Sequence, residues 1–460
     1  MNDLIAAVNA AVRGPVMIAL LAGTGIYLSV RTGFPQVRRF RYILRNTIGS
    51  LLRREKEARG DNISPFQAVS TALAGTVGTG NIAGVAGAVF IGGPGAVFWM
   101  WVSAFFGMCT KYAEIALAMK YRKQDSSGVY RGGPMYYITG GLGEGWRWLA
   151  VIFAVLGALA AFGIGNLTQS SEIAGACASL FDMRPIATGM ILAAVVTVVL
   201  VGGVKRIGQI TALLVPVMSG FYLLAGLTVI LLRLNDVPSA LLSILQGAFS
   251  LEAAGGGAVG YAIVAAMRQG VSRGVFSNEA GLGSAPIAHA ASSTQNPVDQ
   301  ALWGVFEVFF DTIVICTITA LTLLLSGFEL GPEALAAYPS QGAAAAAAFN
   351  AVLPGQAGGF IIQVSLLFFA LSTIISWSYY GECCLGYLTK DNKLVGMAYK
   401  AFFIFLCIAG ATGSGRVMWD IADTLNILMA VPNLVALLGL SGIVVKMTRD
   451  YFGDPKRKLR

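Results

Sequence analysis

The chain has 460 residues, of which 56% are hydrophobic and only 12% are charged, and its mean hydropathy is +0.70. A chain this apolar cannot cover its own core with polar side chains, so the composition excludes a water-soluble protein and indicates a membrane protein. The formal net charge of +9 follows from membrane topology, as argued below, and we expect no nucleic-acid partner.

Eleven apolar stretches long enough to cross a bilayer follow one another along the chain. They are continuous runs of Leu, Ala, Val and Gly, which favour helices over the alternating strands of a membrane β-barrel. We predict an all-α polytopic membrane protein in which one N-terminal helix precedes ten core helices. The predicted spans are 14–30, 64–92, 94–119, 147–178, 186–203, 207–232, 241–267, 298–327, 357–388, 394–412 and 416–446.

Most of the 32 Lys and Arg fall in alternate loops between these spans. The richest are the amphipathic run 31–59, which predicts an interfacial helix, the loop 120–131 and the tail from Lys446; Arg268 and Arg273 are assigned to the same side. By the positive-inside rule the N-terminus is outside and the C-terminus is cytoplasmic. We expect a bacterial-type inner (plasma) membrane. The first span follows no basic segment, so we expect it to be retained.

Reactive side chains are few. The six cysteines have no metal-ligand spacing and are predicted to be small buried residues. His289, the one histidine, falls in a predicted loop, where we interpret it as an ordinary loop residue. Within the spans, Glu114 is expected to pair with Lys111 three residues earlier. Without a constellation of nucleophile and base, we expect no enzyme activity.

Two predicted spans carry glycine runs that weaken a helix. The first is residues 74–81, AGTVGTGN, and the second is 253–260, AAGGGAVG. Close helix packing is the alternative reading of either run alone. Together they mark the first and sixth core helices, which cross in opposite directions, and this placement is typical of a transporter with inverted halves and a central binding site.

The chain is accordingly divided into four parts. We predict an N-terminal helix and basic segment at 1–60, a first five-helix repeat at 61–233, an inverted second repeat at 234–446 and a basic cytoplasmic tail at 447–460.

The motifs at these positions resemble the alanine or glycine:cation symporter family, within the superfamily that shares the leucine-transporter fold. The matching stretches are NISPFQAVSTALAGTVGTGNIAGVAGAVFIGGPGAVFWMW from residue 62, GIGNLTQS from 163, GGGAVG from 255 and RGVFSNEAGLGSAP at 273–286. The resemblance implies import of alanine and/or glycine by symport with sodium. Ser171 stands where the family often has Asn, so substrate preference stays open.

The same resemblance implies a substrate site. The backbone amides of Thr79 and Gly80, beside Gly78, would receive the carboxylate, and the carbonyl of Thr76 the ammonium. Gln169 would complete the polar lining; the alternative is a bond between helices, and Asn166 one turn earlier is its expected partner. The remaining implied residues form a facing wall and a cap and are Gly255, Gly256, Gly257 and Phe249. A phenylalanine such as Phe249 is also common in a helix core.

A sodium site is implied beside it. The ligands would be the hydroxyls of Ser372 and Thr373 with the carbonyls of Ala74, Val77 and Phe369, because sodium is a hard cation that binds oxygen. Asn81 matches a position that serves a second sodium in some relatives. We expect sodium as the co-transported ion, a small zwitterionic amino acid and lipid as partners, and no organic cofactor. A proton-coupled transporter of the same fold is the main alternative; a channel or a membrane enzyme is less consistent with the motifs.

Overall fold

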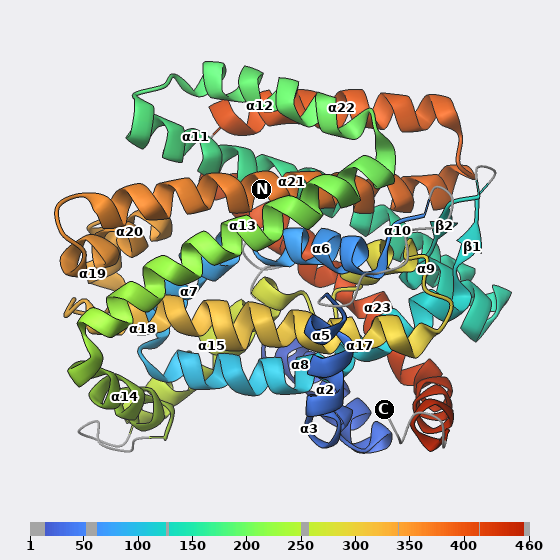
Figure 1. Cartoon of the computed structure of the whole chain (residues 1–460), viewed down its shortest axis with the longest axis horizontal. Coiled ribbons are helices and arrows are strands. Elements are labelled where there is room, and N and C mark those ends of the chain that lie inside the picture. Colours follow the sequence, from blue (N-terminus) through green and yellow to red (C-terminus); the bar gives the residue numbers. More distant parts are fainter. Residues whose placement is uncertain are drawn as a thin grey trace.

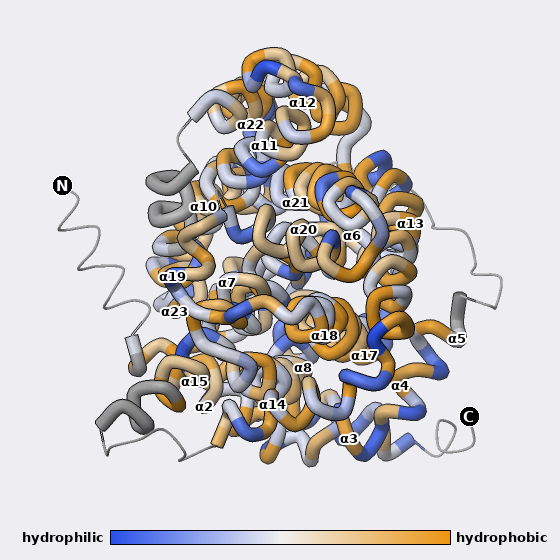
Figure 2. The backbone as a smooth tube through the Cα atoms, turned by 90° about the vertical axis from the view of Figure 1, so that its left-hand side faces the viewer, coloured by the Kyte–Doolittle hydropathy of each residue, from blue (hydrophilic) through white to orange (hydrophobic). Residues whose placement is uncertain are grey.

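The computed structural model describes residues 14–51, 62–125, 128–249, 257–338, 340–413 and 415–454. Long helices lie side by side along the longest axis of the molecule in Figure 1, and Figure 2 looks along them. The helices are α2 (Pro15–Thr32), α3 (Pro35–Arg38), α4 (Phe40–Asn46), α5 (Ile48–Leu51), α6 (Pro65–Thr76), α7 (Val85–Gly92), α8 (Gly95–Tyr121), α9 (Pro134–Tyr137), α10 (Arg147–Phe162), α11 (Thr168–Phe181), α12 (Pro185–Leu200), α13 (Gly203–Leu232), α14 (Val237–Phe249), α15 (Gly257–Asn278), α16 (Ala285–Ala290), α17 (Pro297–Val308), α18 (Thr317–Leu325), α19 (Pro332–Ala336), α20 (Gln341–Val352), α21 (Ala357–Thr389), α22 (Lys393–Thr412) and α23 (Gly415–Gly453).

Short irregular turns connect several of these helices. Strands β1 (Lys123–Gln124) and β2 (Tyr130–Arg131) form an antiparallel hairpin after α8. The π-helical turns are Gly80–Gly84, Ile138–Leu142, Gly163–Leu167 and Phe309–Cys316, and the 3₁₀ turns are Glu144–Trp146 and Leu234–Asp236. A π-helical turn displaces the residues that follow it around the helix axis, and such turns are frequent at functional sites.

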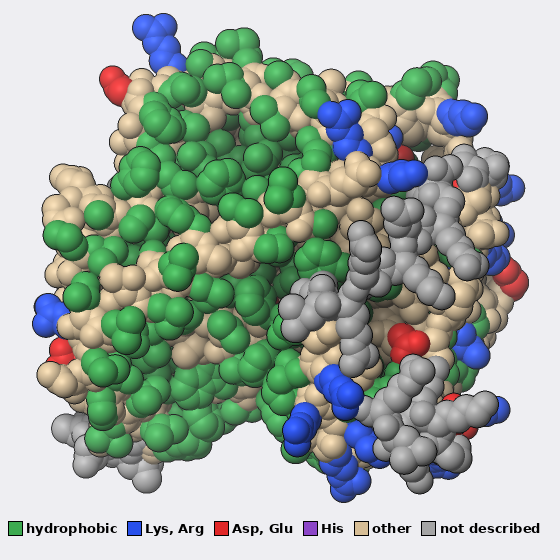
Figure 3. All heavy atoms as spheres, viewed as in Figure 1, with side chains coloured by type: hydrophobic (Ala, Val, Ile, Leu, Met, Phe, Trp, Pro, Cys, Tyr) green, Lys and Arg blue, Asp and Glu red, His purple; other side chains and the backbone are tan. Residues whose placement is uncertain are grey.

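Six helices among the described residues are long and apolar enough to cross a membrane, and the bent pair Pro65–Thr76 and Gly80–Gly92 makes a seventh. Figure 3 shows apolar side chains over most of the visible face, while Lys and Arg gather at the end where α3 lies. The all-helical membrane fold predicted from composition is therefore confirmed at this level.

The first glycine-rich segment interrupts its helix as predicted. Helix α6 begins with a capping box between Ser64 and Gln67 and ends at Val77, whose backbone is extended. The chain resumes helical geometry at Gly80 and continues as α7, bent by 50° from α6. Residues 77–79 thus form a turn that interrupts the helix inside the protein, where irregular backbone is tolerated because it is buried or lines a cavity.

A second interruption lies beyond the glycine run 253–260 of the sequence analysis, of which residues 253–256 are outside the described residues. Helix α15 ends at Asn278, and Glu279, Gly281 and Gly283 have positive φ angles of 54°, 94° and 83° before α16 begins. Glycine adopts this left-handed backbone without a steric cost. The break therefore falls at 279–284, within the RGVFSNEAGLGSAP motif. The predicted span 241–267 is divided between α14 and α15, and residues 250–256 lie outside the described residues.

The two interrupted helices lie against each other in opposite directions. Helix α7 packs on α15, and α6 packs on α16. At one end the backbone of Ile63 bonds to Ala291 and Ser293, and at the other a Cβ on Gly92 would lie 2.9 Å from the Cβ of Gln269. The first half of α15 therefore lies beside the end of α7. Arg268 and Arg273 belong to α15 and lie on the side of α7, opposite Ile63. Their assignment to the side of Ile63 was therefore wrong.

Two further local predictions were wrong because distant helices provide the partners. Lys111 forms its ion pair with Glu307, at 3.4 Å, whereas Glu114 accepts hydrogen bonds from the amides of Gly281 and Gly283. His289 is a fully buried residue of α16, and its Nε2 lies 3.0 Å from Glu307. The carboxylate of Glu114 thus supplies the acceptor that the unwound second break lacks.

Candidate functional site

The unwound turn at residues 77–79 is the centre of the candidate site. The amide of Gly78 donates to Oδ1 of Asn81 at 2.8 Å, which closes the turn. On its other side, a Cβ on Gly78 would lie 2.8 Å from Oγ1 of Thr373, closer than real Cβ contacts allow. Glycine at position 78 therefore lets α21 approach the turn directly.

Four of the five residues of the predicted sodium site lie together. The hydroxyl of Ser372 donates to the carbonyls of Ala74 at 3.2 Å and Phe369 at 2.9 Å. Thr373 donates to the same carbonyls at the same distances. All four residues are buried, and Val77, the fifth, directly precedes Gly78 at the end of α6. The cluster offers hydroxyl and carbonyl oxygens in one place, which is the ligand chemistry of a hard cation.

Gln169 of α11 reaches the same turn through Thr79. Thr79 donates its hydroxyl to Oε1 of Gln169 at 3.2 Å, and the Gln169 amide donates to the carbonyl of Ile164 at 3.0 Å. The π-helical turn Gly163–Leu167 immediately precedes Gln169 on its helix. The hydroxyl of Thr76 bonds within its own helix, to Ala72 and Leu73. All three side chains are buried: the exposed fraction is 3% for Thr76, 1% for Thr79 and 3% for Gln169.

Asn166 does not pair with Gln169 as expected. Its amide donates to the carbonyl of Phe403 on α22 at 2.7 Å, and its oxygen accepts from Ser170 at 3.1 Å. The π-helical turn around Asn166 alters the helical phase between these two positions, so Asn166 and Gln169 contact different neighbours.

The two described residues of the predicted wall and cap, Gly257 and Phe249, are not brought to this turn. Phe249 ends α14, is 56% exposed and packs on Phe98 and Trp99. Gly257 begins α15, and because a helix rises 1.5 Å per residue, it lies roughly 30 Å along the helix from Ser277, which contacts Gly80. Gly255 and Gly256 lie outside the described residues.

Phe276 is the aromatic residue that lies against the turn, where the sequence analysis expected Phe249. A Cβ on Gly80 would lie 3.2 Å from the ring of Phe276, so the ring lies directly against the backbone of the GTGN segment. The residue belongs to the RGVFSNEAGLGSAP motif, which was noted without a role for this side chain. The motif was therefore the available signal, and only its placement opposite Gly80 was missing.

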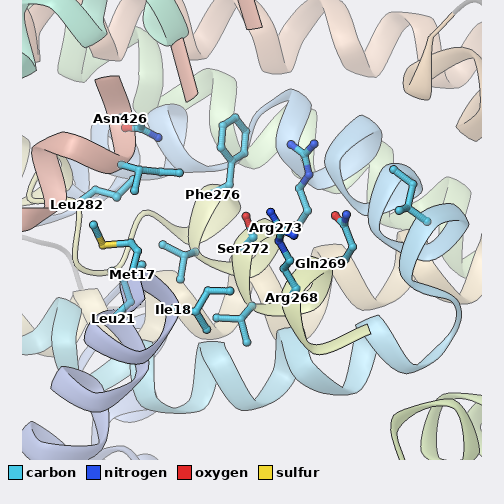
Figure 4. A pocket seen from close by; sticks show the side chains of 14 residues that line it. Met17, Ile18, Leu21, Arg268, Gln269, Ser272, Arg273, Phe276, Leu282 and Asn426 are labelled. Atoms are coloured by element: carbon cyan, nitrogen blue, oxygen red, sulfur yellow. The ribbon is translucent and has the colours of Figure 1, made fainter. Parts of the chain in front are cut away.

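A cavity of about 360 Å³ extends away from Phe276 between α2, α7, α15 and α23. Figure 4 shows Met17, Ile18 and Leu21 of α2 on one side and the α15 side chains Arg268, Gln269, Ser272 and Arg273 facing the same space. Asn426 of α23 also lines it, and its buried Oδ1 has no hydrogen-bond partner. The cavity therefore combines a polar lining with direct contact to Phe276.

Comparisons with known proteins identify the family of the chain. The model of the sodium:alanine symporter family matches residues 1–460. The sodium/alanine symporter AgcS of Methanococcus maripaludis is 48% identical over 455 residues, covering 98% of this chain and 97% of AgcS. The putative sodium/proton-dependent alanine carrier protein YrbD of Bacillus subtilis is 36% identical over 470 residues, covering 100% and 94%.

A solved structure of a sodium-coupled sialic acid symporter has the same fold. It matches 96% of this chain and 86% of its own with a TM-score of 0.50 and 12% sequence identity. At this identity the likeness concerns the fold alone. With the family match over the whole length and the high identity to AgcS, the conclusion is direct: the chain is a membrane transporter, not an enzyme, and belongs to the sodium:alanine symporter family.

Proposed function

We propose that this protein imports a small neutral amino acid, alanine and/or glycine, by symport with sodium. The observation that carries the proposal is the unwound turn at 77–79. Thr373 contacts it at Gly78, within a cluster of oxygen atoms, and Gln169 contacts it at Thr79. A cation bound beside Thr373 and an amino acid bound beside Gln169 would share one short backbone segment, which couples their binding free energies.

The proposed substrate site uses backbone groups of this turn. The amides of Thr79 and Gly80 would bind the carboxylate, the carbonyl of Thr76 the ammonium, and Gln169 would complete the polar lining. An unwound helix presents donors and acceptors about an α-carbon apart without ionised side chains, which suits a zwitterion. Phe276 replaces Phe249 as the aromatic wall in this proposal, because its ring contacts Gly80.

The cavity beyond Phe276 is the proposed access route. It begins at the ring of Phe276 and runs between α7 and α15, on the side of the molecule opposite Ile63. With the N-terminus outside and the C-terminus cytoplasmic, as the basic loops favour, this side faces outward and uptake proceeds inward.

The wider architecture is part of the proposal. Eleven spans are inferred, with an N-terminal helix and basic segment at 1–60, repeats at 61–233 and 234–446, and a basic tail at 447–460. The antiparallel pairing of α6 and α7 with α16 and α15 supports two inverted halves. In this scheme each interrupted helix is the first helix of its half.

Proton coupling is the second candidate, because the name given to YrbD includes the proton as well as sodium. Purified protein in proteoliposomes separates the two candidates. Uptake of labelled alanine and glycine at fixed pH should be far faster with an inward sodium gradient than in choline buffer, since the Ser372 and Thr373 cluster offers only oxygen atoms to the cation. Equal uptake in both buffers would reject sodium coupling and favour the proton.

Phe276 provides a test of the proposed wall. Replacing it by leucine should weaken alanine affinity about tenfold, the factor that corresponds to about 1.4 kcal/mol, because the ring surface against Gly80 is lost. The matched control is Phe249→Leu, on a side chain that is 56% exposed and remote from the turn. Alanine-binding isotherms should differ between the two variants; equal affinities would remove Phe276 from the substrate site.

A further inference from the structure

A cavity of about 340 Å³ lies between α2, α3 and α23, at the end of the molecule where Lys and Arg gather in Figure 3. None of the residues of the candidate substrate and sodium sites lines it. Four of the residues that do line it are arginines, which are Arg31, Arg38, Arg39 and Arg449. Two segments more than 400 residues apart in the sequence thus bring four positive charges to one cavity.

The cavity lies where two membrane spans end. Arg31 directly follows the predicted span 14–30, and Arg449 lies three residues beyond the predicted span 416–446. Helices α2 and α23 pack on each other, and the hydroxyls of Tyr27 and Ser441 lie 3.3 Å apart between them. Both spans leave the hydrocarbon core here, so the cavity lies at the depth of the lipid headgroups.

The charges of these arginines are not compensated within the part of the chain that the structure describes. The ion pairs found there include none of the four. Arg31 donates to the hydroxyl of Tyr27 at 2.6 Å, and the guanidinium of Arg39 lies 5.2 Å from the ring centre of Phe452. These contacts orient two guanidinium groups and leave their charge in place. Like charges in one cavity repel each other, so an anion bound between them is favoured.

The rest of the lining is partly apolar. Val30, Pro35, Val445 and Phe452 contribute to it, and Val30, on the bilayer side of Arg31, is 60% exposed. A free phosphate ion would use the arginines alone. A phospholipid would place its phosphate among the guanidinium groups, whose planar donors match phosphate oxygens, and its acyl chains along the apolar residues.

We propose that this cavity binds the headgroup of an anionic phospholipid. Basic pockets between membrane helices on the cytoplasmic side bind such headgroups, and this end of the chain is the one predicted to be cytoplasmic. The bound lipid bridges Arg31, Arg38 and Arg39 after the N-terminal helix to Arg449 of the last helix. It therefore fastens the N-terminal helix to α23, and this role is independent of which substrate or ion is transported.

The test measures lipid binding and stability on the full-length protein. Protein purified and freed of lipid in a neutral detergent receives phosphatidylglycerol or phosphatidylcholine with the same acyl chains. Native mass spectrometry counts the bound lipid, and the melting temperature is recorded on the same samples. Phosphatidylglycerol should bind at least tenfold more tightly than phosphatidylcholine and should raise the melting temperature, because only its headgroup carries a net negative charge.

Arg38→Gln combined with Arg449→Gln is the decisive variant. Neither guanidinium has a hydrogen bond or an ion pair within the described residues, so the lipid-free variant should melt at the wild-type temperature. Its affinity for phosphatidylglycerol should fall about tenfold or more, since two charges that attract the headgroup are lost. Arg449→Gln alone decides the case if the double variant does not fold.

The matched control is Arg41→Gln combined with Arg45→Gln. Both residues are exposed on α4, belong to the same basic segment and do not line the cavity, so the control removes the same charge elsewhere. It should keep the wild-type affinity for phosphatidylglycerol. An equal loss in both double variants would show that the basic surface attracts lipid diffusely and would overturn the site, as would an unchanged affinity when Arg449 is replaced.

A soluble arm separates the lipid from a free phosphate. Inorganic phosphate and glycerol 3-phosphate, at the concentrations at which phosphatidylglycerol stabilises the protein, should leave the melting temperature unchanged, because they cannot use the apolar lining. Equal stabilisation by either of them would assign the cavity to a free phosphate and reject the lipid.

Discussion

Replacing Thr373 by alanine should raise the sodium concentration that half-saturates alanine uptake about ten- to a hundredfold. The hydroxyl of Thr373 contacts the carbonyls of Ala74 and Phe369 and lies beside Gly78, where the proposed ion links α21 to the unwound turn. A hydrogen bond or ligand contact to a charged group contributes about 1.5–3 kcal/mol, which gives this range of affinity.

The control for this substitution lies on the same helix. Thr389 donates its hydroxyl to the carbonyl of Leu385, within α21 and away from the turn, so Thr389→Ala removes the same atoms without touching the proposed ligands. Sodium titrations of alanine uptake should leave Thr389→Ala at the wild-type midpoint. If the midpoint of Thr373→Ala also stays there, Thr373 does not bind the ion.

The break in the first interrupted helix was predictable because its information is local. Gly75, Gly78 and Gly80 fall within six residues, and the helix breaks among them. Glycines in this number depart from what a continuous membrane helix favours. The position of Ser372 and Thr373 was not local information: the resemblance to the family implied it, and in the structure both hydroxyls donate to the carbonyl of Ala74.

The second break of the described structure was not predicted, because composition does not report backbone conformation. The glycine run named in the sequence analysis includes Gly255 and Gly256, which lie outside the described residues, whereas Gly281 and Gly283 have positive φ angles. What maintains this break is the carboxylate of Glu114, far away in sequence, which accepts from the amides of both. Long-range contacts of this kind leave no periodic signal in one sequence.

The partners of the buried charged residues were not predicted, for the same reason. His289 and Lys111 were interpreted from their neighbours in sequence, but both meet Glu307 on α17. Asp311 is a charged residue inside a predicted span, but its hydrogen-bond partners Asn81 and Ser277 lie 230 and 34 residues away in the sequence. These contacts become apparent only in the folded structure, where the three segments lie together.

Gln169→Leu should reduce alanine affinity about ten- to a hundredfold. Oε1 of Gln169 accepts from Thr79, so the side chain lines the proposed carboxylate site, and leucine keeps a similar volume while removing every polar contact. The loss of a hydrogen bond to a charged group, about 1.5–3 kcal/mol, sets the size of the effect. A melting temperature measured on the same purified sample separates this loss from destabilisation, because leucine also leaves the carbonyl of Ile164 without its partner.

Asn166 supplies the comparison that makes the result decisive. It lies one turn earlier, is also buried, and bonds to the carbonyl of Phe403 on α22 and to the hydroxyl of Ser170, so none of these hydrogen bonds reaches the turn at 77–79. Asn166→Leu should lower the melting temperature and leave alanine affinity near the wild-type value, since a buried polar partner is lost away from the turn. Gln169→Leu should lower affinity beyond any shared loss of stability. If the two variants instead show the same pattern, with reduced melting temperature and normal affinity, Gln169 is a structural residue whose bond to Thr79 only fixes the shape of the turn.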